Sequence, residues 1–176
     1  MPDRLTARLT RPLLLILVFA VAGLAGGYAW RYLWTPPTGV ASEGRWIPTP
    51  VEEGLQGAFS AVGWYVVVAL TLGLLLGALT AFVLDRAEIV GVLVALVGSV
   101  LTAYLILTVG ESLSPPDPDE VAAESDDGTE IPGDLELDGR TPLLSAPIGA
   151  LTALSTVYLL TTRRRLDQRV DEGTAG

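Results

Sequence analysis

Four long stretches of the chain consist almost entirely of hydrophobic residues, and polar segments separate them. The longest, residues 60–84, contains no Asp, Glu, Lys, Arg, His, Asn or Gln. A helix of this length extends about 37 Å, which exceeds the roughly 30 Å hydrocarbon core of a bilayer. Residues 12–32, 89–109 and 143–162 are similarly apolar. The pattern predicts an all-α membrane protein, a single domain with four transmembrane helices packed as a bundle.

The first apolar stretch also resembles a secretory signal peptide. It follows a basic start that contains Arg4, Arg8 and Arg11, and it includes Ala20-Val21-Ala22, which fits a cleavage site. The apolar run nevertheless continues beyond these residues to Trp30. We therefore expect a retained first membrane span, with a cleaved signal peptide as the alternative.

The polar segment 35–59 is expected to contain a β-hairpin and the start of the second helix. Ser42-Glu43-Gly44 is typical of a turn, and short apolar stretches lie on both sides of it. Thr49 and Glu52 have the spacing of a capping box, with Pro50 in the first helical turn. The second helix is therefore predicted to begin near Pro50 with Thr49 as its cap.

The second polar segment, residues 110–142, is predicted to form a small acidic cap together with the first. Asp117 is placed to cap a short helix, and Leu135 and Leu137 alternate with acidic residues in the manner of a brief strand. Such a strand could pair with the hairpin. Residues 111–140 hold eleven carboxylates and one arginine. Because this composition is also typical of disordered chains, disorder is the alternative to an ordered cap.

The positions of the basic residues predict the orientation in the membrane. All eleven are arginines. Eight of them fall on one side of a four-span arrangement, namely Arg4, Arg8, Arg11, Arg86, Arg163, Arg164, Arg165 and Arg169, and three on the other, Arg31, Arg45 and Arg140. Positive charge is enriched in cytoplasmic loops. We therefore expect a multi-pass protein of a bacterial inner membrane, with both termini in the cytoplasm and the acidic segment outside.

Small residues recur every four positions in the predicted helices. They are Gly23 and Gly27 in the first; Ala69, Gly73, Gly77 and Ala81 in the second; Gly91, Ala95, Ser99 and Ala103 in the third; and Ser145, Gly149 and Ala153 in the fourth. Residues four apart share a helix face, and small ones let two helices approach closely in lipid. The stripes predict packing faces, either inside the bundle or between subunits of a homo- or hetero-oligomer. The alternative is that Ala and Gly are simply abundant.

Composition argues against several kinds of chemistry. Cysteine and histidine are absent, which removes disulfides, thiolate chemistry and the commonest metal ligand and general base. The interiors of the predicted spans carry no ionisable residue of the kind that coupled transporters and intramembrane proteases need. We expect no enzymatic activity and no cofactor. The net charge of −9 argues against nucleic-acid binding.

Charged and aromatic residues gather near the outer boundary of the predicted spans. The four tryptophans fall near this side of the membrane, which favours an aromatic belt over a ligand cage. Glu111 follows the expected end of the third helix, where the helix dipole disfavours negative charge. Arg31 or Arg140 would compensate, so we predict an interfacial salt bridge. The other carboxylates do not match an EF-hand loop and are expected to be solvated.

The second polar segment carries short motifs that resemble a known family. It opens with Gly110-Glu111-Ser112-Leu113-Ser114-Pro115, contains Asp117-Pro118 and closes with Asp138-Gly139-Arg140-Thr141-Pro142-Leu143-Leu144 before Pro147. With the four spans, this resembles an actinobacterial family of small four-pass membrane proteins classed only as a domain of unknown function. The resemblance implies an inner-membrane protein and brings no activity, substrate or site residue.

These patterns together predict a non-catalytic structural or accessory component of a cell-envelope membrane assembly. One alternative is a small transporter or channel for a lipid or neutral solute. It requires a polar groove lined by the hydroxyl groups of the spans, which are Thr71, Thr80, Ser99, Thr102, Thr152, Ser155 and Thr156. Another is an envelope sensor whose acidic external segment binds a cation, which requires carboxylates that share a focus.

Overall fold

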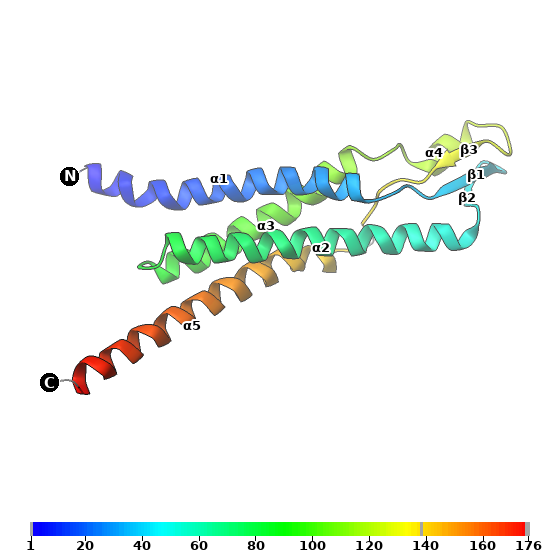
Figure 1. The fold of residues 1–176 in the computed structure, drawn as a ribbon. Helices are drawn as coiled ribbons and strands as arrows, with labels where there is room; N and C mark the ends of the chain where they lie inside the picture. The colour runs from blue at the N-terminus through cyan, green and yellow to red at the C-terminus, as the bar shows by residue number, and fades with distance from the viewer. Residues whose placement is uncertain (1, 138, 175–176) are drawn as a thin grey trace.

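The computed structural model describes residues 2–137 and 139–174. Four long helices dominate it: α1 (Pro2–Leu33), α2 (Val51–Val83), α3 (Glu88–Ser112) and α5 (Ser145–Thr174). Each contains a stretch long and apolar enough to cross a membrane, as the hydrophobic pattern predicts. The start of α1, the turn between α2 and α3, and the end of α5 lie at one end of the molecule (Figure 1).

The remaining elements gather at the opposite end. They are β1 (Thr38–Ser42), β2 (Arg45–Pro48), α4 (Pro118–Ala123) and β3 (Glu130–Pro132). The 3-10 turn η1 (Thr141–Leu144) leads directly into α5 and packs against the helices. The strands form one antiparallel sheet in the order β2-β1-β3. We call the described residues of segments 35–50 and 113–140 the head (Figure 1).

The predicted hairpin and the predicted cap of the short helix are confirmed. Glu43 and Gly44 have φ angles of 51° and 72°, as the two-residue turn between β1 and β2 requires. The Asp119 N–H donates to Asp117 Oδ1 (2.9 Å) at the start of α4. The acidic segment is also tied to the hairpin, because the Trp46 N–H donates to Asp119 Oδ1 (2.9 Å).

The start of α2 is confirmed, but its predicted cap is wrong. The helix begins at Val51, directly after Pro50 as expected. Pro50 itself is the N-cap residue, and no side chain accepts a hydrogen bond from the first turn there. The Thr49 hydroxyl instead donates to the carbonyl of Ile47 (3.3 Å), which belongs to β2.

The predicted strand at Leu135 and Leu137 is also wrong. The third strand lies earlier, at β3, where Gly39 and Ile131 are partners. Both leucines belong to an extended segment outside the sheet, and both are buried against the helices. The predicted alternation of side chains is nevertheless observed, because both leucines are buried while Asp134 and Glu136 are more exposed.

The long helices associate mainly as two pairs, α1 with α3 and α2 with α5. A Cβ added at Gly73 or Gly77 would collide with the backbone of Ala146 or Ala150 on α5. Such contacts require the absence of a side chain. The helices therefore meet through their smallest residues.

Large apolar side chains cover the outer faces of the same helices. Leu17, Leu75, Val97 and Leu159 are each more than half exposed. Water-soluble bundles bury their large apolar residues, and soluble proteins rarely expose continuous apolar belts of this extent. An arrangement with small residues inside and large apolar residues outside fits a lipid environment.

Candidate functional site

Three aromatic side chains join the helices directly below the head. Trp30 of α1 donates its Nε1–H to the carbonyl of Ala61 on α2 (2.8 Å), and Tyr65 of α2 donates to the carbonyl of Ala103 on α3 (2.8 Å). The rings of Trp30 and Tyr65 meet edge to face, with centroids 5.2 Å apart. Trp34 donates to the carbonyl of Gly57 (3.1 Å). These buried contacts hold α1, α2 and α3 together.

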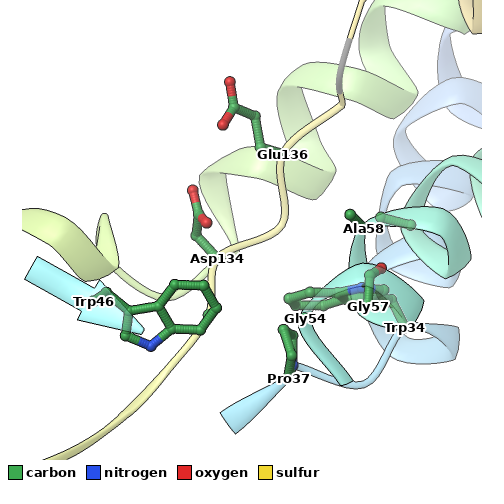
Figure 2. Close-up of a pocket in the computed structure, with 10 residues that line it drawn as sticks. Trp34, Pro37, Trp46, Gly54, Gly57, Ala58, Asp134 and Glu136 are labelled. Carbon is green, nitrogen blue, oxygen red and sulfur yellow. The ribbon is translucent and has the colours of Figure 1, made fainter. Parts of the chain in front are cut away.

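A cavity of about 220 Å³ lies between this layer and the head. Its lining consists of two tryptophans, two carboxylates and several small residues, namely Trp34, Pro37, Trp46, Gly54, Gly57, Ala58, Ala61, Gly133, Asp134 and Glu136. Figure 2 shows the Trp46 ring on one side and Trp34 with Pro37 on the other. We call this the tryptophan cavity.

The aromatic walls are fixed in place by hydrogen bonds and by glycines. Trp46 Nε1–H donates to the carbonyl of Ile131 (3.0 Å), which ties the ring to β3. The ring lies across Gly39 of β1, where any Cβ would collide with the indole. On the other wall, Gly57 of α2 leaves room for the ring of Pro37. The small residues of α2 thus create the space between the two tryptophans.

Asp134 and Glu136 are among the residues that line the cavity, and Figure 2 shows both carboxylates directed away from the space between the two tryptophans. They extend from the same side of the extended segment that connects β3 to η1 (Figure 2). This segment is held by the last turn of α3 and the residues just after it, because the Leu137 N–H donates to the Glu111 carboxylate and the Leu135 N–H to Ser114 Oγ. The residues that line the cavity include no basic side chain. The charged residues of the lining are therefore both acidic.

The predicted salt bridge of Glu111 does not form among the described residues, which exclude Asp138. Arg31 Nε–H donates to the carbonyl of Leu113 (3.0 Å), and its guanidinium lies 5.7 Å from the centre of the Trp34 ring. Glu111 instead accepts the Leu137 N–H. Arg140 lies in a separate groove. Carbonyls at the end of a helix lack intrahelical partners, which explains why the guanidinium binds one of them.

The predicted small-residue stripes face the interior on three helices. Those of the first three are all buried: Gly23, Gly27, Ala69, Gly73, Gly77, Ala81, Gly91, Ala95, Ser99 and Ala103. On α5 only Gly149 of the predicted set is buried, and Ser145 and Ala153 are half-buried. The buried α5 residues Ala146 and Ala150 lie one position later in the sequence. The stripe on α5 is therefore offset by one residue from its predicted register.

The buried hydroxyl groups of the spans bind backbone carbonyls. Thr80 donates to Leu76 O (2.7 Å) one turn back, and Thr102 reaches across to Phe19 O of α1 (2.9 Å). Within the described part of the chain, every buried side-chain nitrogen or oxygen has a hydrogen-bond partner. Over the same residues, no group of three or more carboxylates is placed to hold a metal ion.

Sequence patterns did not identify the tryptophan cavity. The sequence pattern assigns Trp34 and Trp46 to an aromatic belt, and Asp134 and Glu136 to a solvated acidic segment. The cavity exists because the strand pairing brings β3, and with it residues 133–136, next to a hairpin some 90 positions earlier. Nothing in the local composition of either segment indicates this proximity.

Comparison of the chain with protein-family models, curated proteins and solved structures found no match. The resemblance to an actinobacterial family therefore stays a prediction.

Proposed function

We propose that this chain is a non-catalytic accessory component of a cell-envelope membrane assembly, and that its head recognises a positively charged group on a small ligand or partner. The observation that carries the proposal is the tryptophan cavity, whose lining residues include two tryptophans and two acidic residues and no basic residue. This combination of groups is complementary to an ammonium or guanidinium ion.

The physical basis is the charge distribution of the cavity lining. The face of an indole ring is negative and attracts a cation by about 0.5–2 kcal/mol, depending on how far water is excluded. Arg31 already makes such a contact with Trp34. The carboxylates of Asp134 and Glu136 add long-range attraction. A volume of about 220 Å³ accommodates one small cationic group rather than a folded partner.

The orientation of the chain supports recognition on the outer side of the membrane. Arg86 lies in the turn between α2 and α3, at the end of the molecule opposite the sheet. The basic residues of the N- and C-terminal segments belong to the same end. By the preference of positive charge for the cytoplasm, we place that end inside and the acidic head outside the inner membrane.

The packing of the spans supports a scaffold more than a transporter. The stripes of small residues are used in contacts between helices of the same chain, and the buried hydroxyls bind backbone carbonyls. A groove between α1 and α2 is lined by Ala25, Gly26, Ala29, Val67, Val68, Thr71 and Leu72. Of these, only Thr71 carries a hydroxyl, so the groove lacks the polar lining that a solute pathway requires.

The test is a ligand titration on the purified full-length chain in detergent. Tetramethylammonium and methylguanidinium are added at constant ionic strength while tryptophan fluorescence and the thermal unfolding midpoint are followed, with sodium as the reference ion. We expect saturable changes with at least one of the two organic cations.

Matched variants locate the binding site. The double variant Asp134→Asn with Glu136→Gln should weaken binding about tenfold, which corresponds to about 1.4 kcal/mol. The control is Asp126→Asn with Glu124→Gln, which removes two carboxylates of the head that do not line the cavity. Equal loss in both double variants, or a response identical to that of sodium, would contradict the proposal.

The accessory role has a separate test. Crosslinking in native membranes followed by co-purification should recover a stoichiometric partner. Recovery of the chain alone at every crosslinker length would argue against membership of an assembly, whatever the outcome of the titration.

A further inference from the structure

A second cavity lies between α3 and the part of the chain that leads into η1. It has a volume of about 480 Å³ and is lined by Tyr104, Leu107, Leu137, Gly139, Arg140 and Leu143. The first two belong to α3, and Leu143 to η1 at the start of the last span. We call it the Arg140 groove. It shares no lining residue with the tryptophan cavity.

The polar end of the groove carries a single positive charge. Arg140 is exposed, and within the described residues its side chain makes no hydrogen bond or ion pair. Arg31, the other arginine near this level, is engaged by Leu113 and Trp34. Residues 111–140 contain eleven carboxylates and only this arginine. Within this acidic segment, Arg140 is therefore the one residue whose charge attracts an anion, and in the head only the exposed Arg45 of β2 carries another positive charge.

The other end of the groove is apolar and continues into the outer surface of the helices. Leu107 and Leu143 are half-buried in its wall, and Tyr104 is 59% exposed. Tyr104 lies about two helical turns below the end of α3. Tyrosine favours the boundary between headgroups and hydrocarbon. Leu144 and Ile148 extend the apolar surface below the groove.

We propose that the Arg140 groove binds an anionic phospholipid of the outer leaflet. The phosphate group would lie on the guanidinium of Arg140, which suits paired phosphate oxygens, and an acyl chain would lie along Leu107 and Leu143. Charge complementarity favours this lipid over an uncharged lipid or an apolar helix, because neither of these has a negative group that pairs with the guanidinium of Arg140. The site is independent of the proposed cation recognition.

The test measures lipid retention on the intact full-length chain. The protein is extracted in a mild detergent, mixed with phosphatidylglycerol or phosphatidylcholine of matched chain length, and analysed by native mass spectrometry. We expect one phosphatidylglycerol to be retained at concentrations where phosphatidylcholine is lost. Arg140→Gln should reduce this retention at least fivefold. The matched control Arg45→Gln, which removes an exposed arginine of β2 outside the groove, should leave it unchanged.

Two further experiments distinguish the phosphate of a lipid from free inorganic phosphate and control for misfolding of the Arg140 variant. Inorganic phosphate at the same concentration should neither compete with the lipid nor raise the thermal unfolding midpoint, whereas phosphatidylglycerol should raise it. Leu107→Asn, which alters only the apolar wall, should weaken phosphatidylglycerol retention as well. Equal retention by Arg140→Gln and Arg45→Gln, equal retention of the two lipids, or full competition by inorganic phosphate would overturn the proposal.

Discussion

At the scale of single residues, the helix interfaces are decided by where a side chain is missing. Gly77 of α2 lies directly against the backbone of Ala150, whereas an added Cβ at Gly63 of the same helix would have no atom within 4 Å. Both residues are glycines in the middle of an apolar helix. Only their surroundings distinguish a packing contact from an unconstrained position.

Replacing these two glycines by alanine should therefore have different effects. Gly77→Ala should lower the free energy of unfolding by about 1–3 kcal/mol, because the methyl group forces α2 away from α5. Gly63→Ala should be neutral or stabilising by up to about 1 kcal/mol, since alanine favours helix. Thermal unfolding in detergent, followed by circular dichroism, measures both. Equal midpoints for the two variants would rule out a tight α2–α5 contact at Gly77.

Sequence periodicity located most of these small residues but not the register on α5. The spacing of four is the same for Ser145–Gly149–Ala153 and for Ala146–Ala150–Leu154, so both sets share the helical period. The buried residues are those of the second set, Ala146, Ala150 and Leu154. Gly149 of the first set is also buried and lies against the backbone of Leu70. The choice depends on the rotation of α5 about its own axis, which is set by contacts with α2 that the α5 sequence does not specify.

At the scale of elements, the head is built by adding a distant strand to a local hairpin. The turn at Glu43 and Gly44 is visible in the sequence because its backbone angles require suitable residues. The third strand was predicted some five residues too late. Alternation predicts which side chains face inward, but an extended segment alternates in the same way whether or not it is paired in a sheet.

Engineered cysteine pairs test the observed pairing in this naturally cysteine-free chain. Val40 and Glu130 are direct partners on β1 and β3, so Val40→Cys with Glu130→Cys should form a disulfide under mild oxidation. Ile47 is the partner of Val40 on β2, the strand on the far side of β1. Ile47→Cys with Glu130→Cys spans two strand spacings, about 10 Å, and should stay reduced. Gel mobility with and without reductant reports both. Crosslinking of the second pair as efficient as the first would contradict the sheet order.

At the scale of the whole molecule, the four long helices place the two ends of the chain at the same end of the molecule and the head at the opposite end (Figure 1). Gly128 lies at an exposed turn of the head with a φ of 89° and no atom near an added Cβ, which makes it a suitable insertion point. An epitope inserted after Gly128 should be accessible to antibody in intact spheroplasts. The same epitope after Gly176 should become accessible only when the membrane is permeabilised. Labelling of the head epitope only after permeabilisation would reverse the proposed orientation.

The sequence by itself determined the four apolar helices, the hairpin, the cap of α4 and the identity of most small interface residues. These features depend on local properties, since hydrophobic length, turn chemistry and helical period are all encoded by neighbouring residues. Only the tertiary structure decided which helices form pairs, that β3 joins β1, and that Trp34, Trp46, Asp134 and Glu136 line one cavity. Those outcomes depend on contacts between residues far apart in the chain, for which the single sequence has no periodic signature.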